Sequence, residues 1–183
     1  MFSKEQLEER FLEFSKVERS PSLHLICVRQ QQKDDATKDQ LRNAPLHSCP
    51  DQVECTITDG LIGDRWQPGD CPGSQVSIVD LRIIKTIAET KEDWHKNGDN
   101  FICDLELARH VLSVGQQIQI GNQVVLEVND TDHAGCDRFA ARYGKDAVKW
   151  INSVEGKKLR RRGIKATVIK GGMVSCGDTI QML

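Results

Sequence analysis

Short strand-like runs separated by turns constrain the fold of this chain more than any other feature of its sequence. Residues 53–58 and 101–107 alternate apolar and polar side chains, as strands with one buried face do. Two further runs, at 116–120 and 123–128, are joined through Gly121-Asn122, a pair that favours a β-hairpin. Additional runs lie at 23–29, 74–79 and 164–170, and a shorter one ends the chain. The pattern predicts about seven short strands.

Three segments show the helical spacing of apolar residues instead. The first, at 3–14, begins with Ser3 and Gln6 in the spacing of a capping box. The second follows Asp80, an expected N-cap residue, and the third covers 146–154. The apolar residues of these segments are Leu7, Phe11, Leu12, Phe14, Leu81, Ile84, Ile87, Ala88, Trp150 and Ile151. We expect the first helix to pack on the main body or on a partner.

The order of strands and helices decides between two architectures. Strictly alternating βαβ units would predict a doubly wound parallel sheet, and this chain does not alternate in that way. We therefore expect a mainly β fold with peripheral helices (α+β), built on a closed, mostly antiparallel β-barrel. Pro21 separates an N-terminal amphipathic helix at 1–20 from a barrel domain at 21–183. The polar stretch 30–45 is expected to be a connection without core residues.

Composition narrows the class of protein. The chain has 183 residues, of which 25 are Lys or Arg and 27 are Asp or Glu, for a formal net charge of -2. This balance argues against a general nucleic-acid binder. No run of apolar residues is long enough to span a membrane, and the charged N-terminus lacks the apolar centre of a secretory signal. The sequence predicts a cytoplasmic protein that binds neither membranes nor nucleic acid.

The number and spacing of the cysteines argue against a disulfide framework and against a structural zinc site. Seven is an odd number, and a chain of this size can build an apolar core without crosslinks. No C-x-x-C motif occurs, and His133 with Cys136 has no second pair of ligands at similar spacing. The seven cysteines are Cys27, Cys49, Cys55, Cys71, Cys103, Cys136 and Cys176.

Cys136 differs from the other cysteines because it lies in a polar turn, within "DHAGCDRFAARYG". A helix that starts at Asp137 would direct backbone N–H groups toward its sulfur. Arg138, and His133 if protonated, would add positive charge, whereas Asp137 would oppose it. A thiolate in this position could attack a carbon or sulfur centre, carry a persulfide or ligate a soft metal. The alternative is a small, buried and inert cysteine, which is the commoner case.

Basic residues provide candidates for holding an anionic ligand. Arg65 follows the turn "GD" at Gly63-Asp64, and its planar guanidinium suits a phosphate or carboxylate. The run "KKLRRRG" at 157–163 would suit a phosphate, although a solvated surface loop is the simpler interpretation. The sequence contains no phosphate-binding P-loop, no G-x-S-x-G elbow and no H-E-x-x-H helix. Common NTPases, α/β-hydrolases and zincins are therefore excluded.

Taken in order, these segments resemble a known family. The succession is "GLIGDRW", "GDN", "VGQQIQIGNQVVLEV", Cys136 in a loop, and "RRGIKATVIKGGMVSCGDTI". It resembles the MOSC domain, named for the C-terminal domain of molybdenum cofactor sulfurase, over roughly residues 23–182. The single pieces are unspecific, but their order and spacing are not. The pattern is that of a stand-alone, bacterial-type member.

The resemblance implies a fold and a function. MOSC domains are β-barrel-like with peripheral helices, and they carry one family cysteine at the position of Cys136. In the mitochondrial amidoxime reducing component and the bacterial hydroxylaminopurine reductases, that cysteine ligates molybdenum, and the enzymes reduce N-hydroxylated compounds. In sulfurase-type members the domain has been viewed as a sulfur carrier or as a module that holds the cofactor. Both functions remain open here.

The resemblance also assigns residues. It implies Cys136 as the catalytic residue and as the ligand of molybdenum or sulfur. The residues assigned to binding molybdenum cofactor (molybdopterin) are Asp64, Arg65, Asn100, His133, Arg162 and Gly163. Two positions depart from the family pattern: Asp99 replaces the glutamate of Gly-Glu-Asn, and "DHAG" replaces a proline-containing loop before the cysteine.

Partners follow from the same resemblance. The chain contains neither the N-terminal barrel domain of the mitochondrial proteins nor the C-terminal helical extension of some bacterial ones, so we expect a protein electron donor or a sulfur-transfer partner. The expected small molecules are the cofactor and a substrate. Pyridoxal phosphate is not expected, because no lysine lies in a motif that indicates a Schiff base.

Overall fold

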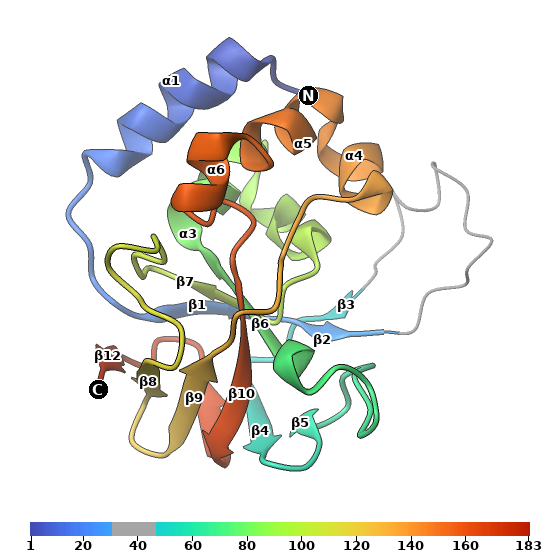
Figure 1. Cartoon of the computed structure of the whole chain (residues 1–183), viewed down its shortest axis with the longest axis vertical. Coiled ribbons are helices and arrows are strands. Elements are labelled where there is room, and N and C mark those ends of the chain that lie inside the picture. Colours follow the sequence, from blue (N-terminus) through green and yellow to red (C-terminus); the bar gives the residue numbers. More distant parts are fainter. Residues whose placement is uncertain (31–46) are drawn as a thin grey trace.

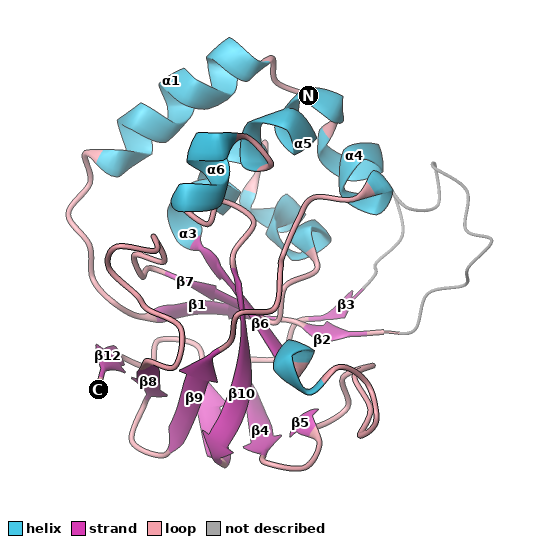
Figure 2. Cartoon of the chain, viewed as in Figure 1, coloured by secondary structure: helices cyan, strands magenta, loops and turns pink. Residues whose placement is uncertain are grey.

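Figure 1 shows the computed structural model of the chain, which describes residues 1–30 and 47–183. The predicted polar connection at 30–45 therefore lies almost wholly outside the described residues. The strands gather in one part of the molecule and most helices cover one end of it, as the colours of Figure 2 make clear. None of the described helices is long and apolar enough to cross a membrane.

The main sheet confirms the predicted mainly β fold. All of its neighbouring strands pair antiparallel except β6 and β7, which are parallel. In spatial order its strands are β1 (Leu23–Ile26), β7 (Phe101–Cys103), β6 (Val76–Asp80), β10 (Ile164–Lys170), β9 (Val124–Val128), β8 (Gln117–Ile120) and β12 (Ile180–Met182). The predicted hairpin is β8–β9, although its loop has three residues, 121–123, because Ile120 pairs with Val124.

Backbone hydrogen bonds join the two edges of this sheet into a barrel. Ser22, just before β1, forms an antiparallel bridge with Thr179, just before β12. Leu23 N–H donates to Asp178 O at 2.9 Å, and Ile180 N–H donates to Pro21 O at 2.9 Å. These contacts pair groups that an open sheet would leave exposed at its edges. The predicted closure of the barrel is confirmed.

Two smaller sheets extend the barrel. The strands β11 (Gly172–Ser175), β4 (Gln52–Thr56) and β5 (Gly60–Leu61) form one of them, and β11 follows β10 directly in the chain. The other is a two-stranded ladder of β2 (Val28–Arg29) and β3 (His47–Ser48). This ladder continues from β1 and leads into the region of the candidate site.

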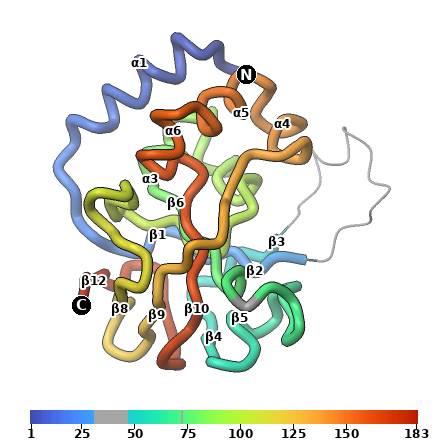
Figure 3. Tube along the Cα trace, viewed as in Figure 1, coloured from blue at the N-terminus to red at the C-terminus, as the bar shows by residue number. Residues whose placement is uncertain are grey.

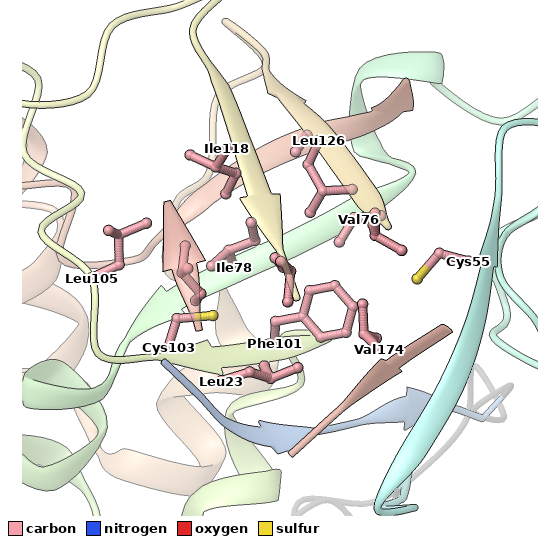
Figure 4. Close-up of a cluster of buried hydrophobic side chains, with 14 of the residues drawn as sticks. Leu23, Cys55, Val76, Ile78, Phe101, Cys103, Leu105, Ile118, Leu126 and Val174 are labelled. Atoms are coloured by element: carbon pink, nitrogen blue, oxygen red, sulfur yellow. The ribbon is translucent and has the colours of Figure 1, made fainter. Parts of the chain in front are cut away.

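The barrel interior is a single apolar core. Phe101, Ile118 and Leu126 are fully buried there and come from three different strands, as Figure 4 shows. Burying a side chain of this size contributes about 1.5–3 kcal/mol. In β4, β8 and β10 inward residues alternate with outward ones, which is the pattern that predicted strands, whereas β6 and β7 are buried at every position. The core therefore fixes the strand ends from which the site is built.

A second core lies between the barrel and the helices at its end (Figures 1 and 3). Phe11 packs edge-on against Trp150 with ring centroids 5.6 Å apart, and Leu7 is buried beside them. Leu12 was expected to join this face but is 58% exposed, because it lies about a quarter turn away from the Leu7–Phe11 stripe. The helices are α1 (Lys4–Ser15), α3 (Leu81–Ile87), α4 (Asp137–Tyr143), α5 (Lys145–Ile151) and α6 (Val154–Lys158), with 3-10 turns η1 (Pro72–Ser74) and η2 (Lys91–Asn97).

The predicted starts of two helices are confirmed. Ser3 and Gln6 form the capping box of α1, and the side chain of Asp80 accepts the Arg82 N–H at the start of α3. The apolar face of α1 packs on α3 and α5 of the same chain. Of the two expected arrangements for this helix, packing on the main body is therefore the one that the structure shows.

Candidate functional site

Cys136 lines a cleft with a volume of about 600 Å³. The thiol is exposed, at the residue that precedes α4, and its backbone is extended. The alternative of a buried cysteine is therefore wrong, and a reactive role of the thiol stays a prediction. The cleft is lined by Arg29, Arg65, Trp66, Asp70, Cys71, Ser74, Ser77, Gly98, His133, Ala134, Cys136, Arg162 and Lys165.

Positive side chains dominate the walls of this cleft. Arg29, Arg65, Arg162 and Lys165 all line it, against the single carboxylate of Asp70. A smaller hollow of about 80 Å³ also borders Cys136, Arg65 and Arg162, and Arg138 and Arg142 contribute to its wall. Such a concentration of like charge in a concave surface attracts anions. The site is suited to an anionic ligand that has one end near a thiol.

Asp64 and Asn100 build the buried frame beneath one wall. Arg29 forms a bidentate ion pair with Asp64, with Nη2 2.6 Å from Oδ2, and also donates its backbone N–H to that carboxylate. Asn100 donates to Asp64 at 3.0 Å and accepts from Ser77 N–H at 3.0 Å. Although burial alone would raise it, the charge and hydrogen bonds of Arg29 hold the pKa of Asp64 below its usual value. These partners fix Arg29 at the cleft.

Asp99 supports the part of the wall that carries Arg162. Its side chain is fully buried, and one oxygen accepts from Arg162 Nη1 and from the amide of Asn97. His133 Nε2 lies 3.4 Å from the other oxygen. Arg162 Nε and His133 Nδ1 are buried and have no hydrogen-bond partner among the described residues. The departure from glutamate at this position thus supplies a short carboxylate that anchors Arg162.

The histidines of the site are neutral near pH 7. Burial, assisted by the charge of Arg162, holds the pKa of His133 well below its ordinary value. Burial and the charges of Arg142 and Arg65 likewise lower the pKa of His47 to about 3. His133 therefore does not supply the positive charge that its protonated form would have added beside Cys136. The arginines and Lys165 supply that charge instead.

These histidines predict acid lability. In the unfolded chain both histidines would titrate near their ordinary pKa. At pH values between this ordinary pKa and the lower pKa of the folded protein, the unfolded state therefore binds more protons than the folded state. The free energy of unfolding should therefore fall with decreasing pH below about 6.5, by up to about 1.4 kcal/mol per pH unit for each histidine. Urea titrations at several pH values between about 6.5 and 4.5 should give a shallower slope for His47→Gln than for the wild type. An unchanged slope in His47→Gln, equal to that of the exposed control His110→Gln, would contradict the assignment.

Gly163 and Arg65 complete the set predicted from the sequence. Arg65 lines the cleft and donates its backbone N–H to Arg29 O at 2.9 Å. Gly163 lies outside the wall, at a turn with φ 97°, where an added Cβ would be 2.2 Å from Ile78 O. The structure brings Cys136, Arg65, His133 and Arg162 to one cleft. Asp64, Asn100 and Gly163 lie behind it, and their predicted role in binding a cofactor remains a prediction.

Sequence reasoning missed several residues of the cleft. Arg29 ends β2 and Lys165 is an outward residue of β10, so each looked like an ordinary charge on a strand. Cys71 is exposed in the same cleft, and a hydrogen bond from Ser74 lowers its pKa. The signal that could have identified Arg29 is its position at the end of the strand-like run "LHLICVR", just before a long polar stretch. The contacts that assemble this wall join residues distant in sequence.

The comparison with protein families decides the identity of the domain. The sequence model of the MOSC domain matches residues 71–181, which is well over half of the chain. The chain belongs to the MOSC family. The resemblance found from the order of its motifs is confirmed. No curated protein matches the sequence of this MOSC protein at a significant level.

Solved structures show the same fold at low sequence identity. YiiM from Geobacillus stearothermophilus is 14% identical with a TM-score of 0.59, over 89% of this chain and 75% of that chain. The YuaD protein from Bacillus subtilis is also 14% identical, with a TM-score of 0.60 over 88% of this chain and 94% of that one. YiiM from Escherichia coli is 14% identical with a TM-score of 0.53, over 88% and 69%. These similarities confirm the MOSC fold of this chain.

Proposed function

We propose that this MOSC protein binds molybdenum cofactor in the cationic cleft, with Cys136 as the protein ligand of molybdenum, and that it reduces N-hydroxylated compounds. The observation that carries the proposal is the exposed Cys136 thiol at a cleft of about 600 Å³ whose walls carry Arg29, Arg65, Arg162 and Lys165. The family of the chain agrees with this interpretation. We expect the protein to act in the cytoplasm.

The residues of the cleft fit the cofactor. Molybdenum cofactor is a pterin with two dithiolene sulfurs and a terminal phosphate, so it needs space, one soft donor and positive charge. The cleft volume lies in the range of small-molecule sites, and a cysteine sulfur is a soft donor. Among the described residues, no group of three His, Cys, Asp or Glu side chains could hold a metal by itself. A metal at Cys136 must therefore bring ligands of its own, as the dithiolene does.

The protein residues would bind and orient the group. Bound molybdenum cofactor supplies the redox chemistry, and the protein contributes position, electrostatics and exclusion of side reactions. Arg65 and Lys165 are placed to neutralise phosphate, and Asp99 keeps the guanidinium of Arg162 directed along the wall. Trp66 also lines the cleft. Cys136 fixes the reacting end.

Metal content tests this proposal. The protein should be purified from cells that make the cofactor, and molybdenum and pterin should be measured per chain. We expect near-stoichiometric loading of the wild type and of the control Cys71→Ala, and at least about a tenfold loss in Cys136→Ala because a direct metal ligand is removed. Absence of metal from the wild type, or equal metal in Cys136→Ala, would reject the proposal.

A second candidate, a sulfur or cofactor carrier without turnover, rests on the same exposed thiol. A thiol that opens directly to solvent is accessible to a partner protein, which an enclosed catalytic cysteine would not be. In this case Cys136 would carry a persulfide for a sulfur-transfer partner, whereas the enzyme would need a protein electron donor. Mass spectrometry of the native protein distinguishes the sulfur carrier from the enzyme, because the sulfur carrier gains one sulfur atom on Cys136 and contains no molybdenum.

A further inference from the structure

A second pair of cysteines lies outside the cleft. The sulfur atoms of Cys27 and Cys49 are 3.8 Å apart. The β2–β3 ladder pairs Val28 with Ser48 and Arg29 with His47, so Cys27 and Cys49 occupy the next opposed position of the same antiparallel register. Neither residue belongs to the site described above.

The position of this pair suits a disulfide. Opposed residues in an antiparallel ladder have Cα atoms about 4.5–5.5 Å apart, within the range of about 4.4–6.8 Å that disulfides span. The sulfurs are already in contact, so rotation of the two side chains can close the bond while the backbone stays in place. A crosslink here would not distort the ladder.

The two thiols differ in a way that orders their reaction. Cys49 is exposed, whereas Cys27 is fully buried. The hydrogen bond between them lowers the pKa of Cys49 and raises that of Cys27, and burial raises the latter further. An oxidant in solution therefore meets Cys49 first, and Cys27 is placed to react with the oxidised sulfur.

We propose that Cys27 and Cys49 are a redox modification site, which a hydroperoxide converts to a disulfide and a thiol reductant restores. In the first step the Cys49 thiolate attacks the terminal peroxide oxygen and the O–O bond breaks; Cys49 becomes a sulfenic acid, and the other oxygen leaves as hydroxide or alkoxide, which takes a proton from solvent. In the second step the Cys27 sulfur attacks the Cys49 sulfur; the S–S bond forms, the S–O bond breaks, and the hydroxyl leaves as water with the Cys27 proton. The two sulfurs together lose the two electrons that the peroxide gains.

The crosslink would tie β3 to the frame of the cleft. Cys27 N–H donates to Asn100 O at 2.7 Å, and Cys27 O accepts from the Asn100 amide at 3.2 Å. Cys27 is thus fixed to the same residue that holds Asp64, while Cys49 directly follows β3, the strand that carries His47 into the small hollow beside Cys136. Oxidation would fasten this strand to the site wall by a covalent bond.

Three other thiols are less suited to form this bond. Cys55 and Cys103 are buried in the barrel core, and burial raises the pKa of each of them. Cys176 is exposed and lies near the pair: its charge contributes to raising the pKa of Cys27, and the charge of Cys49 contributes to raising the pKa of Cys176. It is the competing partner for Cys49, and the experiment has to distinguish the two.

Peptide mapping of the oxidised full-length protein tests the proposal, and it needs no bound cofactor. The reduced protein should be treated with hydrogen peroxide, alkylated with iodoacetamide and digested. We expect a Cys27–Cys49 peptide that dithiothreitol cleaves, and a thermal midpoint that rises by about 5–10 °C on oxidation. Both effects should persist in Cys176→Ser and vanish in Cys49→Ser.

Three outcomes would overturn the proposal. They are a Cys49–Cys176 peptide in place of the expected one, alkylation of both Cys27 and Cys49 after oxidation and denaturation, and oxidation of Cys49 to higher acids without a crosslink. Each can occur whether or not the cleft binds molybdenum cofactor. Failure of this proposal and failure of the proposed function are therefore separate results.

Discussion

Replacing Asp64 with alanine is expected to lower the free energy of unfolding by about 3–5 kcal/mol, because it leaves a buried guanidinium without its counter-charge. The Asp64 side chain is 0% exposed and that of Arg29 only 10%, so water cannot replace the lost carboxylate. The substitution also removes the acceptor of the Asn100 side-chain amide and of the Trp66 backbone N–H. Guanidinium chloride titration of the variant measures the effect.

Two further variants make this result specific. Glu13 is an exposed carboxylate of α1, and Glu13→Ala should change the free energy of unfolding by less than about 0.5 kcal/mol. The double variant Arg29→Met/Asp64→Leu removes both charges and should recover the part of the loss that comes from the unpaired guanidinium, but not the part from the donors that lose Asp64 as acceptor. A loss below about 1 kcal/mol in Asp64→Ala would show that the pair is not buried as described.

Replacing Gly163 with alanine is expected to cost about 3–5 kcal/mol, from backbone strain and from a collision. At φ 97° any side chain is strained, and the new Cβ would lie 2.2 Å from the carbonyl oxygen of Ile78 in β6. The backbones at Gly163 and Ile78 cannot move apart easily, because β6 and β10 are paired through Ile78 and Ile164. Relief of the collision would displace Arg162, the neighbouring residue in the cleft wall.

Gly177 provides the matched control for this variant. It has nearly the same backbone conformation, φ 94°, but nothing lies within 4 Å of an added Cβ. Gly177→Ala should therefore cost only the strain, about 1 kcal/mol. Equal losses in the two variants, measured by the same denaturant titration, would mean that the close approach at Ile78 is absent.

The sequence predicted the elements of this fold because their signals are local. Alternation at 116–120 and 164–170 reflects strands with one face in the core, and the capping box at Ser3 fixes the start of α1. The ladder β2–β3 was not predicted, since two-residue strands carry no pattern. The parallel pairing of β6 with β7 also has no local signal, because it depends on how the intervening segment returns across the barrel end.

The sequence predicted only part of the candidate site, because only some of its residues carry a local signal. Cys136 stood out because a cysteine in a polar turn is unusual, and the structure places it at the cleft. The pattern around Gly63 identified Asp64 and Arg65 together, but it could not show that Asp64 is buried behind Arg29. Likewise, nothing in "DHAG" indicated that His133 would be neutral, because the burial that lowers its pKa comes from residues distant in the chain.

X-ray absorption spectroscopy at molybdenum tests the central claim most directly, because it counts the sulfur atoms bound to the metal. The measurement should compare the loaded wild type with Cys136→Ser, which offers an oxygen in place of the sulfur. We expect the variant to have one sulfur neighbour fewer per molybdenum and one oxygen neighbour more. An identical sulfur count in both proteins would show that Cys136 does not ligate the metal.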